Sequence, residues 1–198
     1  MSDLNLHNIL YLMAFYPELP LAFAAGSLLL GGTGWWVAPR WGWAQAPTAL
    51  AGCSLALVLA ATLVRPIGMF PPGGLNPVAV VRECVVGSLS LARTYEKLNV
   101  LLLMPFAFFA TLATRRPVIV AACCLLATGA VELLQGATGS GACQLRDVLH
   151  NIGGGVIGVL LAVMTLRFLL RRPPGITPVS GSFAPDRGTT VRYSSDTR

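Results

Sequence analysis

Charged side chains are scarce in this chain of 198 residues: Asp, Glu, Lys and Arg together make up 11% of it, against 55% hydrophobic residues. Residues 19–39 and 41–64 contain no charge at all. A soluble domain of this size cannot bury so much apolar surface. Either run can cross a hydrocarbon core of about 30 Å, which takes about 20 helical residues. The scarcity of charge therefore excludes an ordinary soluble protein and predicts one that spans the cell membrane.

Three further charge-free runs follow, at 98–114, 117–131 and 148–166. Each reaches spanning length if the polar residues at its ends lie at the membrane interface. We therefore predict an all-α fold, a polytopic integral membrane helix bundle with about five transmembrane helices.

Lys and Arg are missing from the first 18 positions, which argues against a cleavable signal peptide. Several of the arginines behind the net charge of +6 stand at the ends of the apolar runs: Arg40, Arg115, Arg116 and Arg167. Such arginines anchor cytoplasmic helix ends under the positive-inside rule, so we expect no nucleic-acid partner. Counting through five helices then predicts a multi-pass protein of the cell membrane, with its N-terminus outside and its C-terminus in the cytoplasm.

The expected organisation has five parts. In chain order they are an extracytoplasmic N-terminal segment (1–18), two transmembrane helices (19–64), an extracytoplasmic loop with an interfacial segment (65–97), a three-helix core (98–172) and a disordered cytoplasmic tail (173–198). The loop is rich in turn-forming residues and then becomes semi-apolar, and whether residues 78–92 re-enter the membrane stays open. The tail is rich in Pro, Gly, Ser and Thr, which is typical of disorder.

Motifs for common chemistries are absent from the sequence. There is no Gly-x-Ser-x-Gly nucleophile motif, and two histidines, His7 and His150, are too few for a zinc cluster. The glycines at 31–34 lack the lysine of a phosphate-binding loop and lie inside an apolar run, so helix packing accounts for them. We expect no metal and no cofactor.

Three polar residues in three different helices are predicted to lie at one depth. Asn99 precedes Arg115 by 16 residues, Glu132 follows Arg116 by 16, and Asn151 precedes Arg167 by 16. At about 1.5 Å of rise per residue, each lies about 24 Å from the arginine end of its helix. Polar groups at this depth are costly unless they pair or carry function.

Helical spacing enlarges this group. Glu132 and Gln135 are three residues apart and Asp147 and Asn151 four apart, so each pair shares a helix face. The short, Gly-rich link between the last two helices should bring Arg146 within reach of Glu132. We predict a functional or ligand-binding cluster of Asn99, Glu132, Gln135, Arg146, Asp147 and Asn151. The alternative, hydrogen bonds between helices with no further role, stays open.

Small residues and cysteines suggest further contacts. Gly154, Gly155 and Gly158 form a surface that lets another helix approach closely. Cys84 and Cys143 both fall on the predicted outer face, where a disulfide could tie the 65–97 loop over the cluster, although they could equally be unrelated small residues. The remaining cysteines lie in apolar runs and are expected to be buried: Cys53, Cys123 and Cys124.

Three segments together resemble the VanZ-like family of bacterial membrane proteins: "NVLLLMPFAF" at 99–108, "VELLQ" at 131–135 and "RDVLHNIGGGVIG" at 146–158. The residues that match the family pattern are Asn99, Pro105, Glu132, Gln135, Asp147, Asn151, Gly154 and Gly158. "VRP" at 64–66 and "NP" at 76–77 resemble the actinobacterial members. Ala107 and Ile152 depart from the pattern at helix-packing positions, where the family usually has Gly and often has Thr.

The resemblance implies an all-helical membrane domain of the cell envelope. The member that gave the family its name is associated with low-level resistance to the glycopeptide teicoplanin, so tolerance of such antibiotics is one expectation. The expected partners are membrane lipid, and with it a lipid-linked wall precursor, a glycopeptide or another membrane protein.

A non-enzymatic binding protein is the favoured interpretation of the cluster. The alternative is a membrane-embedded enzyme that acts on a lipid or lipid-linked wall precursor, with Glu132 as acid or base and Arg146 holding an anionic group. Transport is less favoured, because the central layer of the helices is apolar and no internal repeat is visible.

Overall fold

A computed structural model of the chain describes residues 17–64, 94–140 and 144–170. The elements in these ranges are helical, and none of the described residues forms a strand. Five stretches are long and apolar enough to cross a membrane: Glu18–Trp41, Gln45–Leu63, Lys97–Thr114, Pro117–Thr138 and Leu145–Leu169. The prediction of an all-α bundle with about five transmembrane helices is confirmed.

The first span is a composite of several helical forms. It begins as α2 (Glu18–Gly26), passes through a π-helical turn (Ser27–Gly31), continues as α3 (Gly32–Val37) and ends in a 3₁₀ turn (Ala38–Trp41). A π turn widens the helix locally and is uncommon outside functional or packed sites. Gly42, in the left-handed conformation at φ 66°, ends the span.

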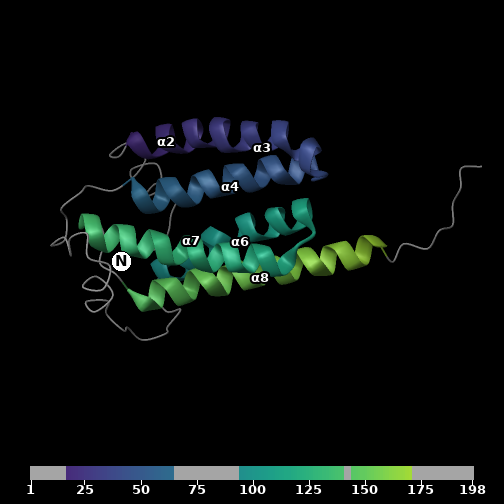
Figure 1. The fold of residues 1–198 in the computed structure, drawn as a ribbon. Helices are drawn as coiled ribbons and strands as arrows, with labels where there is room; N and C mark the ends of the chain where they lie inside the picture. The colour runs from purple at the N-terminus through teal and green to yellow at the C-terminus, as the bar shows by residue number, and fades with distance from the viewer. Residues whose placement is uncertain (1–16, 65–93, 141–143, 171–198) are drawn as a thin grey trace, which may run out of the picture.

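Helix α4 (Gln45–Leu63) runs back along the first span with its backbone close by (Figure 1). A Cβ added at Gly52 would overlap the carbonyl group of Leu30, and one at Gly31 would lie 2.7 Å from the Cys53 sulfur. Glycine at these positions therefore lets the two backbones approach, as the sequence predicts for the glycines at 31–34.

The other three helices form an antiparallel group: α6 (Thr94–Thr114), α7 (Pro117–Thr138) and α8 (Leu145–Leu170) (Figure 1). Arg115, at φ 56°, and Arg116 make the tight connection from α6 to α7. Among the described helices, the most extensive contact is that of α6 with α8. Added Cβ atoms at Gly154 and Gly158 would overlap the carbonyl oxygens of Val100 and Met104 on α6.

Pro105 and Gly155 complete this packing. Pro105 lies inside α6, where it has no N–H to donate to the preceding turn. Gly155 faces α7, since a Cβ there would lie 3.2 Å from that of Cys124. The glycines of α8 thus serve two neighbours, with Gly154 and Gly158 against α6 and Gly155 against α7.

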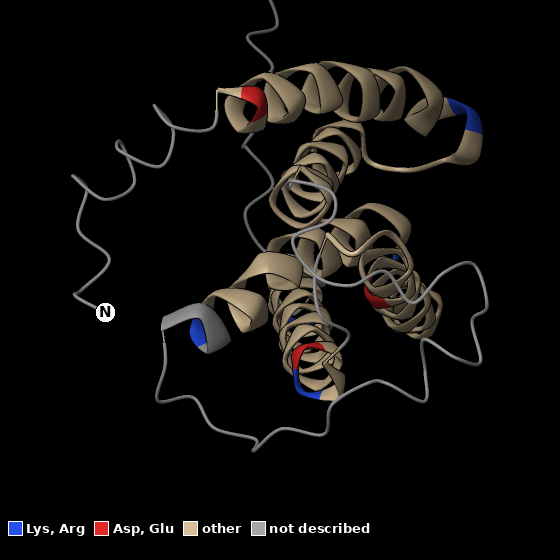
Figure 2. Ribbon diagram, turned by 90° about the vertical axis from the view of Figure 1, so that its left-hand side faces the viewer, with Lys and Arg blue, Asp and Glu red and all other residues tan. Residues whose placement is uncertain are grey.

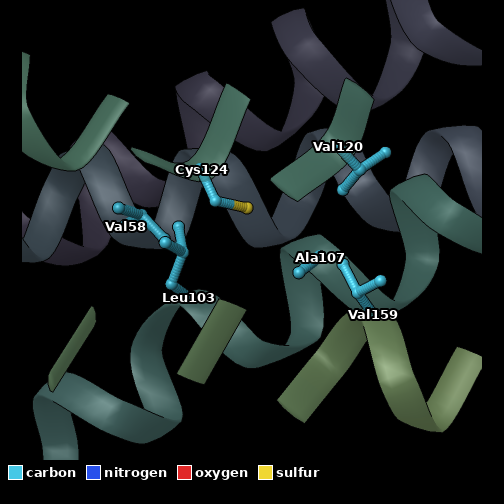
Figure 3. Close-up of a cluster of buried hydrophobic side chains, with 6 residues drawn as sticks. All are labelled: Val58, Leu103, Ala107, Val120, Cys124 and Val159. Atoms are coloured by element: carbon cyan, nitrogen blue, oxygen red, sulfur yellow. The ribbon is translucent and has the colours of Figure 1, made fainter. Parts of the chain in front are cut away.

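The core lies where α4, α6, α7 and α8 meet, and its side chains are small (Figure 3). Its buried members are Val58, Leu103, Ala107, Val120, Cys124 and Val159. Large apolar side chains such as Leu28, Val118 and Phe168 point outward instead. A helix that is apolar on all sides is typical of a membrane span.

Two helices extend beyond the charge-free runs that locate them. Helix α7 continues past residue 131 to Thr138, and α8 begins at Leu145, ahead of residue 148. The helix faces predicted for Glu132 with Gln135 and for Asp147 with Asn151 therefore lie within these helices. Glu132 and Gln135 do not end α7, because both find hydrogen-bond partners while remaining helical.

The expected burial of Cys123 is wrong. Cys124 is buried, Cys53 is half-buried and Cys123 is exposed. An α-helix turns about 100° per residue, so neighbouring residues of α7 cannot both face the core.

Several predictions fall outside the described residues. They concern almost all of the N-terminal segment 1–18, nearly the whole of the 65–97 loop, the tail 173–198 and the pair Cys84 and Cys143.

Candidate functional site

The charged residues gather at helix ends, as Figure 2 shows in a view toward the end of the bundle where α7 ends and α8 begins. We call this the polar end, defined by Glu132, Gln135, Gln144, Arg146 and Asp147. The opposite, arginine end carries Arg40, Arg116 and Arg167, and there the Arg40 guanidinium lies 3.6 Å from the centre of the Trp36 ring.

Glu132 holds the beginning of α8 against α7. Its side chain is only 5% exposed, and its Oε2 atom accepts a hydrogen bond of 3.1 Å from the backbone N–H of Gln144. The carbonyl of Gln144 accepts hydrogen bonds from the N–H groups of Asp147, at 2.9 Å, and Val148, at 3.3 Å. These bonds form the first turn of α8. The Glu132 carboxylate therefore satisfies the backbone donor just ahead of the helix, a place where such donors lack helical partners.

Arg146 extends the same network. Its guanidinium donates to the side-chain oxygen of Gln144, and its Nε atom lies 3.6 Å from Oδ1 of Asp147. Glu132 and Arg146 are thus connected through Gln144, which binds one by its backbone and the other by its side chain. Asp147 also stands in the first turn of α8, where a carboxylate favours the positive end of the helix dipole.

Gln135 fastens α7 to α4. Its Nε2 atom donates a 2.7 Å hydrogen bond to the carbonyl of Thr62, in the last turn of α4, and both residues are buried. The bond joins residues 73 positions apart in sequence and crosses the two helices at the polar end.

Asn151 and Asn99 lie near this network. Asn151 is one turn beyond Asp147 and half-buried, and its Oδ1 atom is buried without a hydrogen-bond partner. Asn99 is half-buried beside Val100, whose contact with Gly154 brings the start of α6 against α8. The Asn99 side chain makes no hydrogen bond to another described residue.

An apolar cavity of about 250 Å³ adjoins the network between α4 and α7. Its lining includes Thr62 and Leu63 of α4, Leu103 of α6, Thr128 and Leu134 of α7, and Asn151 of α8. We call it the α4–α7 cleft. Because Thr62 also accepts the hydrogen bond of Gln135, the cleft begins directly beneath the polar network.

Sequence reasoning missed two members of the site, Gln144 and Thr62. Gln144 binds Glu132 through its backbone N–H, and Thr62 binds Gln135 through its carbonyl, so neither contact depends on the side chain. Gln144 could have been noticed as a polar residue immediately before an apolar helix. In the described part of the chain, no group of three His, Cys, Asp or Glu side chains could hold a metal ion.

Comparison with known proteins gives one match. Residues 73–168 match the family model described as VanZ/LLP1. No curated protein and no solved structure matches the chain. The matched stretch contains α6, α7 and nearly all of α8, and with them every residue of the polar network except Thr62. This stretch of the chain therefore belongs to the VanZ-like family of membrane proteins.

Proposed function

We propose that this protein is a cell-envelope protein whose polar end binds the head group of a lipid-linked wall precursor and so contributes to tolerance of glycopeptide antibiotics. The observation that carries the proposal is the buried Glu132, which organises Gln144, Arg146 and Asp147 into one network beside an apolar cleft. Amide and charged groups next to an apolar cleft suit a ligand with a polar head and a hydrocarbon chain.

The charge distribution supports placing this network outside the cell. Arg40, Arg115, Arg116 and Arg167 all belong to the arginine end, and the positive-inside rule assigns such an end to the cytoplasm. The polar end then faces the outer leaflet, and the C-terminus lies in the cytoplasm. Wall precursors and glycopeptides meet on that side of the membrane.

Deletion and complementation test the proposal. Cells that lack the protein should become more susceptible to glycopeptides, and the wild-type gene should restore tolerance. Glu132→Ala and Arg146→Ala should abolish complementation, and Asn99→Ala and Asn151→Ala should weaken it. The control is Thr165→Ala on α8, whose hydroxyl bonds only to Leu161 of its own helix. If the four polar variants are present in the membrane at normal levels and complement fully, the proposal is wrong.

The enzymatic alternative has one specific observation in its favour. Glu132 is a buried carboxylate connected through Gln144 to a guanidinium, an arrangement that could transfer a proton beside an anionic group. The test is turnover of labelled lipid-linked precursors by the purified protein. Turnover that is lost in Glu132→Gln would establish an enzyme, and its absence across a broad panel would leave the binding function.

A further inference from the structure

The α4–α7 cleft exists because two neighbouring helices scarcely touch. Helix α4 packs on the first span and on α6, and α7 packs mainly on α8, so little contact remains between α4 and α7. The space between them measures about 250 Å³. Leu103 of α6 and Asn151 of α8 line its inner side.

The cleft opens sideways, toward the surroundings of the bundle. Leu134 on its rim is 47% exposed, and Ala130, one turn earlier on α7, is also exposed. Toward the polar end, the hydrogen bond from Gln135 to Thr62 joins the two helices across it. In a chain with five membrane-spanning helices, a side opening of this kind faces lipid chains.

The wall of the cleft is unsuited to water. It is made largely of Leu, Val and Ala, and the hydroxyl of Thr62 already donates to the Val58 carbonyl at 2.7 Å. A buried water needs two to four polar partners, and an apolar cavity without them stays dry or takes an apolar guest. The buried, unpartnered Oδ1 atom of Asn151 is the exception, and it marks one place where a guest could donate a hydrogen bond.

The size of the cleft selects among apolar guests. A helix of another protein is about 10 Å across and cannot enter 250 Å³. An engineered cavity of about 150 Å³ in an unrelated protein binds benzene, so the cleft has room for roughly ten carbon atoms. A segment of one hydrocarbon chain meets that limit, and segments of two chains side by side do not.

We infer that the α4–α7 cleft binds a single hydrocarbon chain of a membrane lipid, whose head group then lies at the polar network. The chain enters between α4 and α7, past Ala130 and Leu134, and reaches Leu103, and a hydroxyl or amine of the head group lies within reach of the Asn151 Oδ1 atom. The identity of the head group rests on the proposed function, whereas occupancy of the cleft by a chain does not.

Photo-labelling from inside the cleft tests this inference. The full chain is placed in lipid nanodiscs of phosphatidylglycerol and phosphatidylethanolamine, with a small fraction of phospholipid or polyprenyl phosphate that carries a diazirine near the middle of its chain. Labelled residues are identified by mass spectrometry. Leu103 is the decisive position, because its side chain is only 3% exposed and lines the cleft. Labelling there requires a chain inside the bundle.

A matched pair of variants separates the cleft from the general lipid surface. Ala130 and Ala122 are both exposed residues of α7, and Ala130 lines the cleft. Ala130→Phe should lower labelling of Leu103 about tenfold, which corresponds to about 1.4 kcal/mol of binding free energy, and Ala122→Phe should leave it unchanged. Ala130→Leu, a smaller obstruction, should give an intermediate loss.

Each outcome decides a different question. Labelling by the polyprenyl probe supports both the cleft and the proposed function. Labelling by the phospholipid probe alone supports the cleft and counts against a wall precursor as its ligand. Absence of label at Leu103 with both probes overturns the inference, as does equal labelling in Ala130→Phe and Ala122→Phe, or a crosslink from the cleft to residues 65–93 of the same chain.

Discussion

At the scale of single residues, the polar end depends on a buried carboxylate that accepts a backbone N–H. Glu132 accepts a hydrogen bond from the backbone N–H of Gln144. The side-chain oxygen of Gln144 in turn accepts a hydrogen bond from Arg146, and its carbonyl accepts those of the first turn of α8. Removal of one buried partner leaves the other without a hydrogen bond, and this usually costs more than the bond itself contributes. Substitutions that retain an acceptor oxygen at position 132 should therefore differ sharply from those that do not.

Glu132→Ala should destabilise the protein by about 1–3 kcal/mol, because the partly buried N–H of Gln144 loses its acceptor. Glu132→Gln keeps a side-chain oxygen at the same position and should recover most of that loss. The measurement is the midpoint of thermal unfolding of the purified protein in detergent. Equal midpoints for the two variants would mean that the hydrogen bond to Gln144 contributes little.

Asn151 and Gln135 offer a contrast between an amide with an unpaired oxygen and one that joins two helices. Oδ1 of Asn151 has no hydrogen-bond partner among the described residues, so Asn151→Leu removes an unpaired polar atom and should leave stability unchanged or raise it. Gln135 donates to the Thr62 carbonyl, so Gln135→Leu leaves that carbonyl unpaired and should lower stability by about 1–3 kcal/mol. The same thermal assay compares them, and a loss of stability in Asn151→Leu would show a structural role.

At the scale of helices, the glycines of α8 set how closely it approaches α6. A Cβ at Gly154 would overlap the Val100 carbonyl, whereas Gly153, its neighbour, has nothing within 4 Å of such an atom. Gly154→Ala should therefore cost about 1–3 kcal/mol through overpacking, and Gly153→Ala should be nearly neutral. Thermal unfolding of both variants in detergent is the measurement, and similar midpoints would contradict the close contact of α6 with α8.

The sequence predicts the helices better than it predicts their contacts. Charge-free runs locate five spans because membrane helices must be long and apolar, and the spacing of Gly154 and Gly158 indicates a packing face. The π-helical turn at Ser27–Gly31 leaves no such pattern, and it lies where Gly31 and Gly52 bring two backbones together. Such a local change of winding depends on the partner helix and is not visible in one segment alone.

In the polar site, too, the sequence predicts the residues better than it predicts their contacts. Residue type and depth indicate Glu132, Gln135 and Arg146, since polar groups are rare in apolar runs. Their partners, the N–H of Gln144 and the carbonyl of Thr62, are backbone groups that any residue could supply. The α4–α7 cleft is likewise invisible in the sequence, because it reflects the lack of contact between two helices.

At the scale of the whole molecule, the separation of the two ends predicts the orientation in the membrane. Arg40, Arg115, Arg116 and Arg167 stand at one end, and the polar network, with Arg146 paired to Asp147, stands at the other. Under the positive-inside rule we expect Arg116 in the cytoplasm and Glu132 outside. Two exposed positions report on these ends: Leu145 at the start of α8 and Trp41 at the end of the first span. Each can carry a new cysteine in a variant whose five native cysteines are replaced by serine.

In intact cells, a membrane-impermeant maleimide should label Leu145→Cys and leave Trp41→Cys unlabelled until the membrane is opened. If only Trp41→Cys is labelled in intact cells, the topology is the opposite of the expected one, and the polar network faces the cytoplasm. Such a result would contradict the proposed function, because the polar network could not meet glycopeptides outside the cell. A lipid chain could still occupy the cleft, because its side opening between α4 and α7, beside Ala130 and Leu134, faces the membrane in either orientation. Orientation therefore decides which head groups are available, and the shape of the cleft decides how many chains it holds.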